Sequence, residues 1–298
     1  MTLKASVNGP VVYLDNWAFI ELAKGDPSQR RRFLDAIRSG ADVLFSVTNA
    51  AELSGPQGRS AEAVRTFLDE IGPRWYPAKL NPIEVIDLEK KRENPGAVCF
   101  DEEFFRSYVA DRMRSYDKVF GLTDEFFSLA TMMDRLGPQR KSISETSAEF
   151  DQMLKSRMSS AHQNSKRDPL FLDRKFPLVP FDPARPASFV FFNLLRIMAL
   201  ESNSLTKGDG LDFCHAVMGC AFANFTTLDT TWKRRIANLP KPNWLACVYA
   251  RAELDRMIAD IESAIAKSNQ RSVLVLNEAI RKQLTGSIGP CQIIERLI

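Results

Sequence analysis

The sequence predicts an α/β protein: a three-layer α/β/α domain with a central parallel sheet, interrupted by a large, mainly helical insertion. Short runs of β-branched and aromatic residues, typical of buried strands, alternate with amphipathic helical segments near the start of the chain and again after residue 205. Up to about residue 55 the order is strand, helix, helix, strand, helix, which favours parallel strands joined by helical crossovers. The middle of the chain has helical periodicity and few alternating segments, which predicts the insertion.

The first half of the core is expected over residues 1–58. Its first strand is VVYL, which ends directly before Asp15, and its second is VLFSVT. Two helices, WAFIELAKG and RRRFLDAIRSG, are expected between them, each ending at a glycine. A third helix, NAAELSG, follows the second strand, with Thr48 or Asn49 as its N-cap.

Residues 59–205 are the expected helical insertion, with segments such as SAEAVRTFLDEI, DEEFFRSYVADRMRSYDKVF and TDEFFSLATMMDRL. The core is expected to resume over residues 206–250, with a helix capped by Asp209, the strand FTTL ending before Asp229, and the strand candidate WLACVY. Residues 251–298 are expected to form a helical C-terminal extension that includes SVLVLNEAIRKQL.

Composition excludes several classes of protein. The 40 Lys and Arg residues nearly balance the 37 Asp and Glu residues, so the net charge of +3 does not by itself indicate nucleic-acid binding. The five cysteines form no CxxC pair, which argues against a disulfide framework or a zinc site. No apolar run approaches the ~20 residues of a membrane helix, and the N-terminus lacks a signal-peptide core. We therefore expect a cytoplasmic protein.

Four acidic residues occupy positions where a parallel sheet would bring them together. Asp15 and Asp229 each follow a strand directly, Glu52 lies four residues beyond the second strand, and Asp212 lies in the first turn of the helix before FTTL. In open α/β sheets, ligands bind outside the carboxyl ends of the strands. Four neighbouring carboxylates repel one another, and a divalent cation relieves the repulsion. Ligands that are all oxygen favour Mg²⁺ or Mn²⁺ over zinc.

Three segments resemble the PIN-domain family of metal-dependent ribonucleases. YLDNWAFIELAKG resembles the family's opening strand and helix, and SVTNAAELSG is similar to its second element, in which Ser or Thr precedes a Glu on a helix. LDFCHAVMGCAFANFTTLD resembles the third and fourth elements. The intervals of 37 residues between Asp15 and Glu52, and of 17 between Asp212 and Asp229, are close to the family's usual spacing. The segments occur in the family's order and together make up 42 of the 298 residues.

The resemblance implies a divalent-metal-dependent nuclease, most often an endoribonuclease that cleaves single-stranded or structured RNA with Mg²⁺ or Mn²⁺. The catalytic and metal-binding residues would be Asp15, Glu52, Asp212 and Asp229. Supporting roles are expected for six neighbours, of which the two threonines would orient a water or a phosphate oxygen and the histidine would steady Asp212: Asn16, Thr48, Asp209, His215, Asn224 and Thr227. The family also implies a toxin or defence effector controlled by an antitoxin or another regulatory protein. A homo-oligomer is left open.

Departures from the family pattern support an alternative, a catalytically inactive PIN-like scaffold or binding module. Trp17 stands where the family usually has Asn, and Asn224 stands where many members carry another acid. The interval of 160 residues between Glu52 and Asp212 is also far longer than in minimal PIN toxins. A phosphatase is disfavoured, because LDNW lacks the second Asp of a DxDxT nucleophile motif.

Two basic groups are candidate nucleic-acid contacts. The first follows Asp229 directly and would grip substrate phosphate: Lys233, Arg234 and Arg235. The second lies in the insertion, with phenylalanines interleaved: Lys166, Arg167, Arg174 and Lys175. Basic residues with aromatics suit a single strand, through phosphate contacts and base stacking. The alternative for the second group is a loop whose aromatic residues merely pack.

Overall fold

A five-stranded parallel sheet forms the centre of the protein, which confirms the predicted α/β class. The computed structural model describes residues 3–7, 9–55, 61–72, 74–91, 99, 101, 128–201, 205–206, 208–240, 245–267 and 272–276. The strand order is β4-β3-β2-β5-β6 and every neighbouring pair is parallel. The strands are β2 (Val11–Tyr13), β3 (Asp42–Ser46), β4 (Trp75–Ala78), β5 (Phe225–Thr227) and β6 (Cys247–Tyr249).

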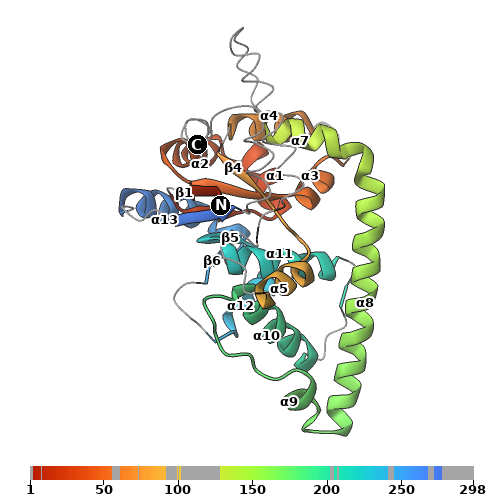
Figure 1. The fold of residues 1–298 in the computed structure, drawn as a ribbon. Coiled ribbons are helices and arrows are strands. Elements are labelled where there is room, and N and C mark those ends of the chain that lie inside the picture. Colours follow the sequence, from red (N-terminus) through yellow and green to blue (C-terminus); the bar gives the residue numbers. More distant parts are fainter. Residues whose placement is uncertain are drawn as a thin grey trace.

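Helices cover both faces of the sheet, as the three-layer prediction requires (Figure 1). One group lies above the sheet in that view: α1 (Asn16–Lys24), α2 (Pro27–Ser39), α3 (Val47–Leu53), α4 (Ala61–Glu70) and α7 (Leu129–Leu136). A second group lies below it: α5 (Pro82–Lys90), α10 (Pro186–Leu200), α11 (Asp209–Phe222) and α12 (Thr230–Ala237). Helix α13 (Leu254–Lys267) packs against α2.

The long helix α8 (Arg140–Arg167) runs along one side of the molecule, from α7 near the sheet to α9 (Phe171–Lys175) at the far end (Figure 1). It belongs to a helical stretch from 129 to 222, in agreement with the predicted helical insertion. A carboxylate fastens this stretch to α5: the buried Glu89 accepts hydrogen bonds from the first backbone N–H groups of α10, at Ala187 (2.7 Å) and Ser188 (2.8 Å). Among the helices that the structure describes, none is both long and apolar enough to cross a membrane.

The strand order creates a switch point between β2 and β5. From β2, the sheet grows through β3 and β4 in one direction and through β5 and β6 in the other. Tyr13 at the end of β2 is level with Leu44 of β3 and Thr226 of β5, so these strands end at one edge. Ligands of open α/β sheets bind at such a point, outside the carboxyl ends of the strands.

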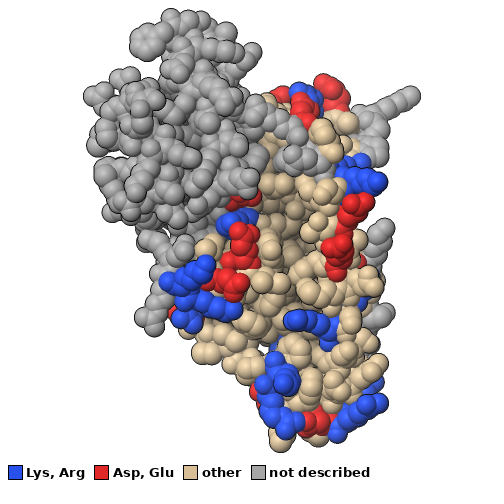
Figure 2. Space-filling model, turned by 45° about the vertical axis from the view of Figure 1, so that its right-hand side comes forward, with Lys and Arg blue, Asp and Glu red and all other residues tan. Residues whose placement is uncertain are grey.

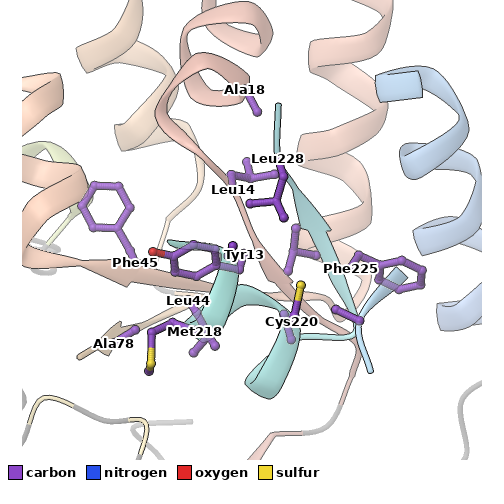
Figure 3. Packing of buried hydrophobic residues seen from close by; sticks show 14 of the residues in the cluster. Tyr13, Leu14, Ala18, Leu44, Phe45, Ala78, Met218, Cys220, Phe225 and Leu228 are labelled. Carbon is purple, nitrogen blue, oxygen red and sulfur yellow. The ribbon is translucent and has the colours of Figure 1, made fainter. Parts of the chain in front are cut away.

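Helix α11 packs directly on the central strands (Figure 3), where Met218 and Cys220 lie among the side chains of the sheet. The contact is close because Gly219 faces the sheet without a side chain. A Cβ atom at this position would lie 2.4 Å from Oγ1 of Thr226 and 2.9 Å from Cδ1 of Tyr13. The glycine therefore sets the depth at which α11 lies on β2 and β5.

Two sequence predictions about the strands are corrected. The second strand ends at Ser46 rather than Thr48, and Ser46 is the N-cap of α3, with its hydroxyl accepting from the N–H of Asn49. Neither Thr48 nor Asn49 is the cap, because the strand turns into the helix two residues earlier than the apolar run suggests. Strand β4 lies inside the range 59–205 and pairs with β3, so the sheet extends into the expected insertion.

The C-terminal extension also differs from its prediction. Residues Ser272–Leu276 form a strand, β7, which pairs antiparallel with β1 (Leu3–Val7), instead of starting a helix. A short apolar run such as SVLVL fits either structure, and here a partner strand decides it. Only α13, with the short turn Arg251–Glu253 before it, is helical in the described part of the extension. The helix expected for DEEFFRSYVADRMRSYDKVF lies outside the described residues, apart from its first position, Asp101, which is not helical.

Replacing Gly219 by alanine should destabilise the protein by roughly 1–3 kcal/mol, because the added methyl group has to push α11 away from β2 and β5. Denaturant unfolding measures the change. Gly137→Ala is the matched control: its Cβ would meet only the Cβ of Ser54, at 3.9 Å, so its free energy of unfolding should change by less than about 0.5 kcal/mol. Equal stability of the two variants would contradict the packing described here.

Candidate metal site

The four predicted carboxylates lie around the carboxyl edge of the sheet, at the switch point. Asp15 follows β2 and Asp229 follows β5, and these two strands are neighbours. Glu52 lies in the second turn of α3, the helix that leaves β3 at the same edge. Asp212 lies in the first turn of α11, which runs back along the sheet towards the start of β5. Four separate segments of the chain thus contribute one acid each.

Electrostatic coupling shows that the acids are close to one another. Burial and, to a smaller extent, the charge of Asp229 raise the pKa of Asp15 to about 6. Burial also raises the pKa of Asp212 to about 7, with contributions from Asp15, Asp229, Asp209 and Glu52. The pKa of Glu52 is raised to about 7 by burial and by Asp15, while Arg140 lowers it. The site therefore binds protons that isolated carboxylates would release.

Local hydrogen bonds orient the two aspartates that follow strands. Asp15 is the N-cap of α1, and its Oδ1 accepts from the N–H of Asn16 at 2.7 Å. Asp229 is the N-cap of α12, and its Oδ1 accepts from the N–H of Trp232 at 2.8 Å. The N–H of Asp15 donates to Oγ1 of Thr227 at 2.8 Å, which ties the end of β2 to β5. The helix caps thus hold both carboxylates at the edge of the sheet.

The donor set has the chemistry of a Mg²⁺ or Mn²⁺ site, because carboxylate oxygens are the ligands that these hard cations prefer. The side chains do not form a complete metal-binding site: among the described residues, no group of three or more His, Cys, Asp or Glu is placed to hold a metal ion. One oxygen of each of three acids already has a partner: Oε2 of Glu52 accepts from Nδ2 of Asn16, and Oδ1 of Asp15 and Oδ1 of Asp229 each cap a helix. Rotation of side chains would be needed to bring the oxygens onto one cation.

Asp151 of α8 supports the site, although no pattern in the sequence points to it. Its carboxylate accepts from the N–H groups of Gly208 (3.2 Å) and Gly210 (2.8 Å), at the start of α11. These hydrogen bonds and Lys155 lower its pKa. A Cβ on Gly210 would lie 2.8 Å from the Cα of Asp151, so α8 and α11 touch through their backbones. The insertion thus fixes the turn that carries Asp212.

His215 does not steady Asp212 as expected. Its buried ring instead places Nδ1 2.5 Å from the hydroxyl of Tyr13, and Nε2 has no hydrogen-bond partner among the residues that the structure describes. Burial lowers the pKa of His215 to about 4, so the ring is neutral at pH 7. The three-residue spacing does place Asp212 and His215 near one face of α11, but the histidine turns towards the sheet. It is a packing residue between α11 and β2.

The other five predicted supporting residues lie at different distances from the site. Asn16 and Thr227 lie at the site, as described above. Asp209 is the first residue of α11 rather than its N-cap, which is Gly208, and it accepts from the hydroxyl of Thr206 at 2.8 Å. Thr48 is buried in α3, where it lines a cavity between α3, α5, α8 and α11. Asn224 precedes β5 and accepts from the N–H of Val11, at the opposite edge of the sheet from Asp229.

Arg235 is not available to a nucleic acid, contrary to the prediction. Its guanidinium is buried, donates to Oε2 of Glu201 at 2.8 and 2.9 Å, and stacks 4.4 Å from the ring of Trp232. Lys233 pairs with Glu253, whereas Arg234 is exposed. The three positions follow one another on a helix, so they point in different directions, and one of them has to face the core.

The second basic group lies at the far end of α8 and on α9, where all four side chains are exposed: Lys166, Arg167, Arg174 and Lys175. Arg174 pairs with Asp168. Charged side chains gather at this end of the molecule (Figure 2). A helix rise of ~1.5 Å per residue puts Lys166 about 22 Å from Asp151, and hence well away from Asp212. This group is not part of the acidic site.

Comparison with known protein families, with curated proteins and with solved structures found no match for this chain. The fold and the acidic site therefore rest on the geometry described above.

The raised pKa values predict that stability falls as the pH rises. The folded protein holds protons on Asp15, Glu52 and Asp212 up to about pH 6–7, whereas the unfolded chain releases them near pH 4. Asp212→Asn removes one such charge. It should raise the free energy of unfolding by roughly 1–3 kcal/mol at pH 8 and leave it almost unchanged at pH 4.

Urea unfolding of the metal-free protein at both pH values measures this effect. Asp35→Asn, on the exposed face of α2, is the control and should show no such difference between pH 8 and pH 4. If Asp212→Asn is no more stable than the parent at pH 8, the repulsion between the acids is not a cost to folding.

Proposed function

We propose that this protein is a divalent-metal-dependent nuclease with a PIN-like fold, and that its most fitting activity is the endonucleolytic cleavage of single-stranded or structured RNA. The observation that carries the proposal is the group of four carboxylates at the switch point of a parallel sheet, where burial and neighbouring charges raise the pKa values of Asp15, Glu52 and Asp212. Perturbed carboxylates of this kind mark functional sites more often than structural ones. The resemblance of three chain segments to PIN domains supports the same activity.

Asp15 is the central residue of the proposed site. Its charge raises the pKa of both Glu52 and Asp212, and the charge of Asp229 raises the pKa of Asp15. The four acids would hold Mg²⁺ or Mn²⁺ directly or through water. When bound, such a cation supplies Lewis-acid stabilisation of the negative charge that develops on a phosphodiester during hydrolysis. Thr227 contributes by fixing the backbone of Asp15.

A cavity of about 690 Å³ reaches the turn of α11 that carries Asp212 and offers a place for part of a nucleotide. It lies between α3, α5, α8 and α11, and Leu211 and Cys214 in its wall are on the same turns of α11 as Asp212. Most of its lining is apolar, and it includes the aromatic ring of Phe150 on α8. We propose that a base next to the scissile phosphate packs against this ring.

A scaffold without catalytic activity is the second candidate. It is favoured by the side-chain arrangement, because the described acids do not form a finished metal cage. It is also favoured by Trp17, which stands where PIN domains usually have Asn. A toxin or defence role, controlled by an antitoxin, has only the family resemblance to support it.

Purified protein should cleave single-stranded RNA in the presence of Mn²⁺ or Mg²⁺, and EDTA should stop the reaction. Asp15→Asn should reduce cleavage at least about a hundredfold, because it removes the charge at the centre of the site. Gel analysis of a labelled RNA measures cleavage, and Asp35→Asn should retain the parent activity. Calorimetric binding of Mn²⁺ without any cleavage of RNA or DNA would instead support the scaffold.

Phe150→Ala should raise KM for single-stranded RNA by about tenfold and leave kcat within about threefold, because loss of stacking weakens binding more than chemistry. Steady-state kinetics on a short RNA measures both constants. Phe222→Ala is the matched control. Phe222 is also partly buried, but it is the last residue of α11, at the opposite end of this helix from Asp212. An unchanged KM in Phe150→Ala would exclude the cavity as a base-binding site.

A further inference from the structure

Asn49 of α3 is a fully buried polar side chain directly behind the acidic site. Its Oδ1 accepts from the backbone N–H of Ser46 (3.0 Å) and from its hydroxyl (2.8 Å). Its Nδ2 donates to Oδ1 of Asn16 (2.9 Å) and, more weakly, to the carbonyl of Leu14 (3.4 Å). The end of β3 and the end of β2 therefore hold this amide from opposite sides.

These partners fix which way the amide points. The backbone N–H of Ser46 can only donate and the carbonyl of Leu14 can only accept, so Oδ1 of Asn49 has to face Ser46 and Nδ2 has to face β2. Asn16 therefore faces the Nδ2 donor of Asn49 and turns its own Oδ1 towards it. Its Nδ2 is left facing outwards, where it donates to Oε2 of Glu52. A donor is thus directed at Glu52 by two amides in series.

Glu52 needs such a partner. It lies on the exposed side of α3, and the charge of Asp15 repels it from the site. The opposite charge of Arg140 attracts the Glu52 carboxylate but does not fix its orientation, whereas a directed hydrogen bond does. An isolated Asn16 amide could present either its oxygen or its nitrogen to Glu52, and the oxygen would repel the carboxylate. Asn49 removes that choice.

We propose that Asn49 is a positioning residue, which acts through Asn16 to hold the Glu52 carboxylate at the acidic site with Oε1 left for a divalent cation. The role of the cation rests on the function proposed above, whereas the orientation of Glu52 does not. Asn49 itself would not touch the cation or the substrate. Side chains of this kind behind a metal ligand typically change metal affinity by about 10–100-fold when they are removed.

Calorimetry with Mn²⁺ tests the effect on the site. Asn49→Ala should weaken Mn²⁺ binding by about tenfold, whereas in a Glu52→Gln background the same substitution should change the affinity by less than about twofold. The second result distinguishes positioning from general damage, because damage to α3 would weaken binding in both backgrounds. An Mn²⁺ affinity in Asn49→Ala equal to that of the parent would overturn the proposal.

Asn193→Ala is the matched control for the loss of a buried amide. Asn193 of α10 is as buried as Asn49, and its amide bonds to the backbone of Val179 and Phe189, away from the acids. Both substitutions should lower the thermal midpoint, and all measurements are made well below it. Only Asn49→Ala should also weaken Mn²⁺ binding.

A metal-free measurement keeps the inference separate from the proposed function. The side-chain amide resonances of Asn16, assigned by their loss in Asn16→Asp, should shift in Asn49→Ala and in Glu52→Gln but not in Asn193→Ala. If the parent protein binds no Mn²⁺, the metal site fails, and these shifts alone decide whether Asn49 orients Asn16. Unchanged Asn16 resonances in Asn49→Ala would overturn the proposal whether or not the protein binds metal or cleaves RNA.

Discussion

The parallel pairing of β2 with β5 is the constraint on which the rest of this structure depends. It joins two segments more than 200 residues apart, and the hydrogen bond from the N–H of Asp15 to Thr227 closes it at the edge. Because β3 and β4 extend the sheet on one side of this pair and β6 on the other, the helices leave the two strands in opposite directions. The gap that results is where open α/β sheets bind ligands.

The acids at this gap oppose folding, and local structure holds them there. Burial and mutual repulsion raise the pKa values of Asp15, Glu52 and Asp212, so each of these three contributes less stability as the pH rises. The caps at Asp15 and Asp229 offset part of this cost, because each carboxylate accepts a backbone N–H of the helix that follows. A cluster kept in place against its own repulsion is more readily explained by binding a cation than by packing.

Carboxylates that accept backbone N–H groups at the start of a helix also join the helical insertion to the core. Glu89 accepts the first N–H groups of α10, and Asp151 of α8 accepts those at the start of α11. Each carboxylate satisfies backbone groups that a helix start leaves without a partner. Because α11 carries Asp212, the insertion takes part in positioning the site, and α8 also supplies one wall of the neighbouring cavity. Its basic far end lies too distant to act on the acids directly.

The sequence by itself determined the α/β class, the strands VVYL and FTTL, and the carboxylates at their ends, because apolar periodicity and strand-terminal acids are local patterns. It could not determine that SVLVL is a strand, since only pairing with β1 decides this. It could not show that Arg235 is buried against Glu201, or that Asn224 lies at the opposite edge from Asp229. Nor could it find Asn49 or Asp151, because buried hydrogen bonds between distant segments exist only after the chain has folded.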